Sequence, residues 1–168
     1  YLEKNWMPIM DMPFHFVRWS NPVEVVKINL EDKSKERGQQ GILNKLSSTT
    51  VINKEEKFEG PLGIRGSSQV IPFGNEGNRI CITHEVDFFH HPGGHKDAHY
   101  YHRFLIWDKD WNLKSISKQF KFMDAMIEFN TGLAIKNGNF IITYGFQDNA
   151  AYALKMPVNL LDKLEWEE

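Results

Sequence analysis

Two stretches of the sequence repeat each other at a fixed spacing, and this repeat restricts the fold more than any other feature. Residues 77–86 and 138–146 both begin with Gly-Asn, continue through β-branched apolar residues and reach a Thr followed by a ring-bearing residue. The Gly-Asn pairs lie 61 positions apart and the Thr-ring pairs lie 60 apart. A shorter strand pattern precedes each copy, at 68–73 and at 131–136. Hairpins repeated at one period are typical of folds in which each unit buries its apolar face against the next.

Strand signals continue along the rest of the chain, so we predict an all-β fold. Short alternating or β-branched segments occur at 14–19, 23–28, 47–52, 99–107, 113–120 and 152–156. The pair Asn137-Gly138 is the strongest short hairpin signal in the sequence. We expect loops at residues 31–40 and 87–98, and one or two helical turns within 159–166.

The spacing predicts three units of three or four antiparallel strands, at approximately 1–58, 59–122 and 123–168. Four antiparallel strands in each unit is the pattern of a β-propeller blade, and a β-sandwich is the alternative architecture. In the propeller interpretation, residues 64–86 and 127–148 are equivalent hairpins of adjacent, radially arranged sheets.

Composition excludes several classes of function. The formal charge of −2 over 168 residues offers no basic field for nucleic acid or anionic lipid. No run of about 18 apolar residues is present, so no membrane-spanning helix is expected. The single cysteine, Cys81, lies in an apolar strand and is expected to be a buried hydrophobic residue rather than a nucleophile. The N-terminus has neither a signal peptide nor a starting Met, so we expect a piece of a longer, cytoplasmic protein.

Five segments, taken in order, resemble a known family. They are Arg65-Gly66-Ser67-Ser68-Gln69-Val70, Ile82-Thr83-His84-Glu85-Val86, 100–108, 127–133 and 142–148. Their order resembles the C-terminal blades of the five-bladed β-propellers of glycoside phosphorylases and hydrolases that act on β-mannosides. The opening Glu3-Lys4-Asn5-Trp6-Met7-Pro8 is similar to the segment that starts the preceding blade. It is still more similar to propeller domains attached to sugar-transferring enzymes. The resemblance implies about three blades of five.

The resemblance also assigns candidate site residues. By resemblance, His84 contacts phosphate or the reacting water, and Asp148 hydrogen-bonds a sugar hydroxyl. Glycosidases need two carboxylates facing each other, and Glu85, Glu128 and Asp148 could supply such a pair. Of these, Glu85 and Glu128 are the candidate catalytic residues. Arg65 enters a Gly-Ser-Ser turn and is the candidate anion-binding residue, because its planar fork matches phosphate or carboxylate.

Each of these residues also has a structural interpretation. His84 is equally well explained as a satisfied strand-end histidine, Asp148 as a turn residue and Arg65 as half of a surface ion pair. If the chain binds sugar, we expect all five candidates to line one pocket, with Arg65 at its rim.

No metal site and no resident cofactor are predicted. The histidine group comprises His90, His91, His95, His99 and His102. His95 and His99 have helical i, i+4 spacing, but this stretch is expected to be loop and strand, where that spacing does not bring two ligands together. Inorganic phosphate is the candidate co-substrate. Trp6 and Trp19 are expected to fill the core rather than to stack on sugar.

The predicted function is a carbohydrate-active propeller domain that binds a glycoside and is a candidate to cleave or phosphorolyse it. The alternative is a non-catalytic module beside a glycosyltransferase, which recognises glycan or mediates assembly. A partial propeller leaves open sheet edges and an uncovered blade face. We therefore expect a homo-oligomer, or contact with the missing blades of the full-length chain.

Overall fold

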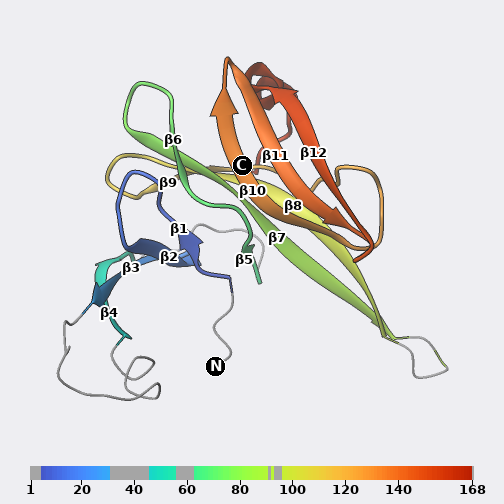
Figure 1. The fold of residues 1–168 in the computed structure, drawn as a ribbon, viewed down its shortest axis with the longest axis horizontal. Helices are drawn as coiled ribbons and strands as arrows, with labels where there is room; N and C mark the ends of the chain where they lie inside the picture. Colours follow the sequence, from blue (N-terminus) through green and yellow to red (C-terminus); the bar gives the residue numbers. More distant parts are fainter. Residues whose placement is uncertain (1–4, 31–45, 56–62, 91, 93–95, 168) are drawn as a thin grey trace.

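The computed structural model describes residues 5–30, 46–55, 63–90, 92 and 96–167, and it confirms the all-β prediction (Figure 1). The described strands form three antiparallel sheets of three to five strands. The predicted loop at 31–40 lies outside the described residues.

The first sheet follows chain order from one edge to the other. Its strands are β1 (Met7–Pro8), β2 (His15–Ser20), β3 (Val23–Leu30) and β4 (Leu46–Asn53). The order β1-β2-β3-β4 is a simple meander in which sequential neighbours pair.

The central sheet contains the longest strands of the described chain. It is formed by β5 (Arg65–Gly66), β6 (Ile71–Phe73), β7 (Asn78–His90), β8 (Lys96–Trp107) and β9 (Leu113–Ile116). The order is β5-β7-β8-β9, and β6 also pairs with β7. Beyond β9, residues 116–118 pair with the C-terminal segment through the Ser117–Trp166 bridge and the 2.8 Å bond from the Glu167 N–H to the Ile116 carbonyl.

The loop predicted at 87–98 is wrong over most of its length. β7 continues to His90 and β8 begins at Lys96, so that Asp87 pairs with His99 and Phe88 with Ala98. The two strands form a long arm that extends away from the rest of the molecule (Figure 1). The polar residues of this stretch hid its strand character, because both faces of the arm carry polar side chains.

The third sheet is a β10 (Glu128–Lys136), β11 (Asn139–Phe146), β12 (Ala150–Pro157) meander followed by a short 3-10 helix, η1 (Val158–Lys163). The hairpin predicted at Asn137-Gly138 is confirmed. These residues have φ angles of 51° and 69°, and the closing pair is Lys136 with Asn139. Positive φ at both turn positions is what a two-residue hairpin of matching twist requires.

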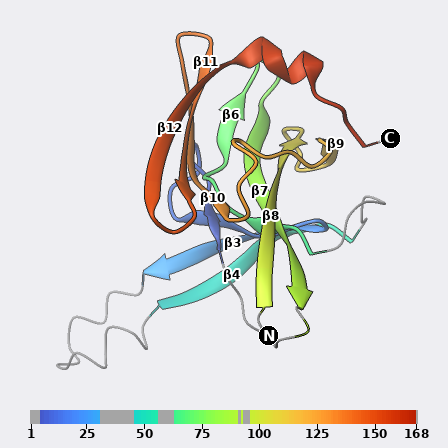
Figure 2. The ribbon, with the colours of Figure 1, turned by 90° about the vertical axis from the view of Figure 1, so that its right-hand side faces the viewer.

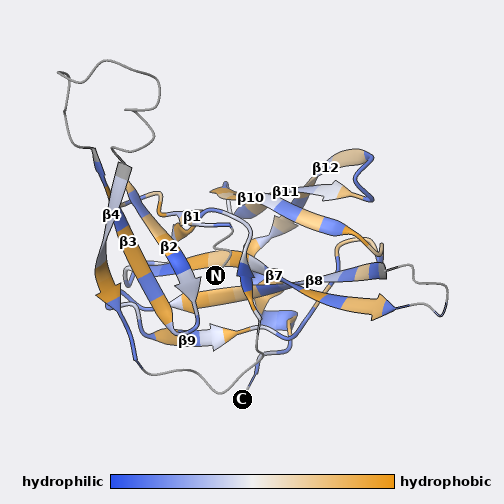
Figure 3. Cartoon of the chain, turned by 90° about the horizontal axis from the view of Figure 1, so that it is seen from below, coloured by the Kyte–Doolittle hydropathy of each residue, from blue (hydrophilic) through white to orange (hydrophobic). Residues whose placement is uncertain are grey.

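Two apolar clusters cover the opposite faces of the central sheet. Side chains alternate along a strand, so Cys81 and Leu105 face the first sheet, whereas Ile82 and Phe104 face the third. Met7, Val17 and Val25 complete the first cluster from the first sheet. Leu133, Phe140 and Ile142 complete the second cluster from the third sheet. The result is three stacked sheets, seen in Figures 2 and 3.

The predicted role of Cys81 is confirmed, because its side chain is fully buried in the first cluster and burial raises the pKa of its thiol. The prediction that Trp19 fills the core is wrong, since this side chain is 39% exposed. Trp6 is half-buried, with its ring centroid 6.2 Å from that of Phe16.

The first strands of the three sheets lie beside one another. The Val70 N–H donates to the Pro8 carbonyl at 2.8 Å, and the Met10 N–H donates to the Val70 carbonyl at 2.9 Å. On the other side, the Leu133 N–H donates to Gln69 Oε1 at 3.2 Å. The segments 64–86 and 127–148 accordingly belong to different sheets. The described strands form no closed barrel or propeller, and the blade interpretation stays a prediction.

Candidate functional site

His84 and Arg65 lie directly opposite each other in the β5–β7 ladder. The His84 side chain is buried, and its Nδ1 lies 2.8 Å from Ser67 Oγ. Its ring stacks on Tyr100 at a centroid distance of 5.8 Å and meets Phe129 edge-on at 5.0 Å. These contacts come from β5 and the turn after it, from β8 and from β10. The central and third sheets therefore hold this imidazole in one orientation.

The imidazole of His84 is neutral near pH 7. Burial, the larger cause, and the positive charge of Arg65 together lower its pKa to about 4. A neutral imidazole offers one donor and one acceptor. One ring nitrogen is taken by the Ser67 hydroxyl, and the role of each partner depends on the tautomer.

Arg65 is exposed, and within the described residues its guanidinium has no hydrogen bond or ion pair. The predicted alternative, a surface ion pair, is therefore not found in that part of the chain. An exposed, planar guanidinium suits a phosphate or carboxylate ligand.

Glu85 lies on the opposite face of β7 from His84 and forms a buried ion pair. Its Oε1 accepts from Arg103 Nε at 2.6 Å, and its Oε2 accepts from the Gln119 amide. Arg103 also donates to the Ser117 carbonyl at 2.8 Å and to the Glu167 carboxylate. Glu85 is therefore committed to a charge network that joins β7, β8 and the C-terminal segment.

Glu128 is fully buried and binds the chain that leads into β10. Its carboxylate accepts the backbone N–H groups of Phe122 at 2.6 Å, Met123 at 2.9 Å and Ala125 at 2.9 Å. His102 Nε2 lies 3.9 Å from the same carboxylate, on the face of the central sheet that packs against the third sheet. Glu85 and Glu128 thus face opposite sides of the central sheet, and the structure does not bring them together.

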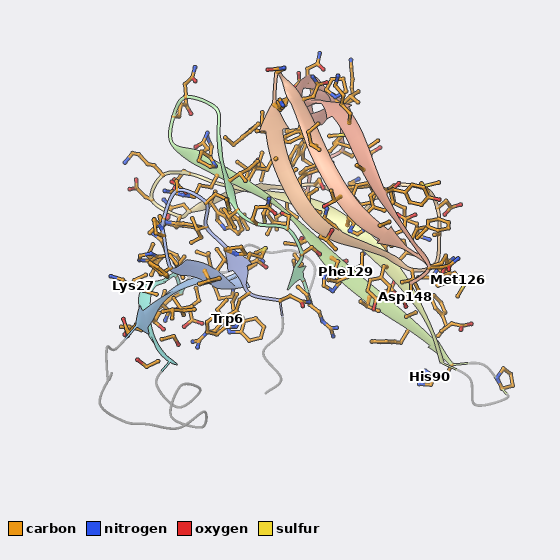
Figure 4. The ribbon with its side chains drawn as sticks, in the orientation of Figure 1. Trp6, Lys27, His90, Met126, Phe129 and Asp148 are labelled. Atoms are coloured by element: carbon orange, nitrogen blue, oxygen red, sulfur yellow. The ribbon has the colours of Figure 1, made fainter. Side chains whose placement is uncertain are left out.

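Asp148 lies in the turn between β11 and β12, exposed to solvent. Gln147 and Asp148 have φ angles of 53° and 51°, and the Asn149 N–H donates to the Phe146 carbonyl at 3.1 Å. This geometry agrees with the interpretation of Asp148 as a turn residue. Figure 4 shows Asp148 near Met126 at the same end of the third sheet as Phe129.

The histidine group is dispersed. His90 and His99 lie on the arm, where the His99 ring packs on Phe89 at 4.7 Å, whereas His102 is fully buried. His91 and His95 lie outside the described residues. Among the residues that the structure describes, no three His, Cys, Asp or Glu side chains are grouped to hold a metal ion. In the same part of the chain, no helix is long and apolar enough to cross a membrane.

Sequence reasoning missed Ser67, Tyr100 and Phe129 as partners of His84, and Arg103 as the partner of Glu85. The alternation of side chains between the two faces of β7 and β8 indicates part of this arrangement. Thr83, Glu85 and Arg103 occupy one face of the ladder, and His84, His102 and Tyr100 the other. The approach of Phe129 across the sheets has no local sequence signal.

No family model matches the sequence, and no curated protein matches it. Among solved structures, a mannose phosphorylase from Leishmania mexicana in complex with phosphate ion is similar, with 10% sequence identity and a TM-score of 0.48. The likeness covers 99% of this chain and 54% of that one, so the chain spans about half the length of that structure. A likeness of this size does not establish a family.

Proposed function

We propose that the chain is a glycan-binding domain whose ligand lies against Tyr100 and Phe129, with Arg65 as the anion-binding group at the rim. The observation that carries this proposal is the His84 cluster. In it a buried neutral imidazole supports two half-buried rings, beside a guanidinium that has no partner among the described residues. The apolar face of a sugar packs on aromatic rings. A hydroxyl or imidazole beside the rings forms hydrogen bonds with the hydroxyl groups of the sugar. The ligand class is a β-mannoside, with inorganic phosphate or a phosphorylated sugar as the anionic part.

The arrangement of the sheets supports a partial propeller as the scaffold. The first and third sheets are meanders in chain order, whereas in the central sheet β5 and β6 both pair with β7. The segment between β5 and β6 bonds to the first sheet through Val70 and to the third through Gln69. In a propeller the innermost strands meet around a central channel, where ligands bind. Arg65 on β5 and Phe129 on β10 are on the first strands of their sheets. Closure of the ring then requires blades outside this chain.

Binding is better supported than catalysis. A general acid or base must reach the substrate within hydrogen-bond distance. Glu85 is occupied by Arg103 and Gln119, and the Glu128 carboxylate is occupied by three backbone N–H groups and has no exposed surface. Neither member of the predicted catalytic pair is therefore placed to act as a general acid or base on a bound substrate.

Calorimetric titration with mannose, a β-linked mannobiose and inorganic phosphate tests the proposal. Arg65→Ala should weaken phosphate binding about tenfold or more, because a charge-assisted hydrogen bond contributes about 1.5–3 kcal/mol. Phe129→Leu keeps apolar bulk but removes the stacking face, so it should weaken sugar binding selectively. Lys27→Ala, an exposed cation on the first sheet far from Phe129 (Figure 4), is the control and should bind both ligands as the wild type does.

Absence of mannoside and phosphate binding to the wild type would refute the proposal. Equal binding by all variants would show that the ligand lies elsewhere.

A further inference from the structure

β12 is an edge strand whose outer side is unpaired in the described part of the chain. It pairs with β11 over eight consecutive rungs with no register shift, and no other described strand joins it. Figure 2 shows β12 along the outside of the third sheet. A long, regular, exposed edge is a template for another strand.

Several other sheet edges in the described chain are protected. Residues 116–118, after β9, pair with the C-terminal segment, and β10 receives the Gln69 side chain at the Leu133 N–H. Among the described strands β4 pairs with β3 alone, but Val51 is an extra residue between the Val25–Ile52 and Val26–Thr50 pairs. Such a bulge breaks the regular spacing of donors and acceptors that an incoming strand needs.

The direction of the β12 peptide groups follows from the ladder. The Val158 N–H donates to the Gly138 carbonyl at 3.0 Å, in the same register as the eight β11–β12 pairs. Hydrogen-bonded pairs alternate along an antiparallel ladder, so the even-numbered residues bond to β11. The N–H and carbonyl groups of Ala151, Ala153 and Lys155 therefore point away from the sheet. Pro157, which lacks an N–H, occupies the next outward position and ends the edge.

We propose that this edge pairs with the same edge of a second copy of the chain, antiparallel and with its two-fold axis at Ala153. In that register Ala153 exchanges two hydrogen bonds with Ala153 of the second copy, and Ala151 lies opposite Lys155. In this register the outward-pointing backbone N–H and carbonyl groups of one copy lie opposite those of the other. Every such donor and acceptor between Ala151 and Lys155 therefore has a partner. The pairing covers this edge on both copies, so no third copy can add to it and the assembly is a dimer.

The side chains suit this self-pairing. Tyr152 is 43% exposed and lies opposite Leu154 of the second copy, which is half-buried, so an aromatic–aliphatic pair forms twice. At the axis, alanine permits close approach. The two Lys155 residues lie four rungs apart, about 14 Å from each other. This exceeds the Debye length of about 8 Å at physiological ionic strength, so their repulsion is screened.

Cysteine cross-linking tests the register. Directly opposed, hydrogen-bonded residues have Cα atoms about 5.5 Å apart, within the range that a disulfide spans. Ala153→Cys should form a covalent dimer under mild oxidation. Lys155→Cys is the matched control, exposed on the same strand but too distant from its counterpart, and it should remain monomeric on denaturing gels. Cys81 is buried and is present in both variants.

Light scattering at increasing protein concentration tests the dimer itself. The wild type should pass from monomer to dimer, and Ala153→Pro should stay monomeric with its melting temperature nearly unchanged, because the lost N–H points outward. A wild type that is monomeric throughout would overturn the proposal. So would a dimer retained in Ala153→Pro, or equal cross-linking of the two cysteine variants. If Ala153→Pro does not fold, the cysteine pair decides, since failure of Ala153→Cys to cross-link is itself a refutation.

Discussion

Two buried neutral histidines should make the fold acid-labile, and His102 should contribute half of the effect. The His102 side chain is fully buried, neither ring nitrogen has a hydrogen-bond partner of normal geometry among the described residues, and its ring packs on Phe122 at 4.5 Å. Burial, the larger cause, and the neighbouring His84 together lower the pKa of His102 to about 3. Burial is also the main cause of the lowered pKa of His84, about 4.

The sign follows from proton binding. In the unfolded chain both imidazoles have a pKa of about 6.5, so between pH 6.5 and pH 4 the unfolded state binds two protons that the native state does not. The free energy of unfolding therefore falls as the pH falls through this window. Each histidine contributes a limiting slope of about 1.4 kcal/mol per pH unit, and the pair about 2.7. Over the first one and a half pH units below pH 6.5, the free energy of unfolding falls by several kcal/mol. This is a large part of a typical domain stability of about 5–15 kcal/mol.

His102→Gln removes one of these protonations and keeps a neutral polar side chain. Urea unfolding at pH 7.5, 6.5, 5.5 and 5.0 should give a pH slope reduced by about 1.4 kcal/mol per pH unit relative to the wild type. The comparison at pH 7.5, where both proteins are neutral at this position, isolates the packing effect of the substitution. Identical slopes for variant and wild type, or an NMR titration of native His102 near pH 6.5, would refute the reasoning.

Two further substitutions test contacts of the fold. Arg103→Ala leaves Glu85 buried without its cation and should cost about 3–5 kcal/mol of unfolding free energy in urea denaturation, whereas a cost below about 1 kcal/mol would show that water replaces the guanidinium. Gly66→Ala places a Cβ 2.2 Å from the Asn5 carbonyl oxygen and 2.6 Å from Met7 Cγ. The backbone junction between the first and central sheets must then shift, and a loss of about 1–3 kcal/mol is expected in the same assay, with an unchanged midpoint as the contrary result.

The elements that sequence reasoning located correctly are those with a local physical cause. The β10–β11 hairpin follows from Asn137 and Gly138, since few other residue pairs adopt positive φ at both positions. The burial of Cys81 follows from its apolar strand. The arm at 87–98 was not recoverable in this way, because its strands are stabilised by pairing with each other rather than by an apolar face. Register is a property of two segments, and neither segment shows it alone.

The five candidate site residues do not line one pocket, and the reason is visible in the sequence. His84 and Glu85 are consecutive, and consecutive side chains on a strand face opposite sides of the sheet. If residues 82–86 form a strand, His84 and Glu85 cannot both line one pocket. The grouping of Glu128 with His102 and of Glu85 with Arg103 required the cross-strand register and the packing of the third sheet, which are long-range properties.

Because side chains alternate along β7, the two faces of the central sheet carry different sets of polar residues. The face that carries Glu85 and Arg103 is closed by an ion pair and by the C-terminal segment, so these two charged groups are engaged in stabilising the fold. The face that carries His84 ends at two half-buried rings and at Arg65, whose charge lacks a partner among the described residues. A charge left available beside supported aromatic rings contributes little to stability, because an exposed guanidinium is already well solvated. Its placement opposite a neutral imidazole is the feature on which the proposed recognition of an anionic ligand by Arg65 rests.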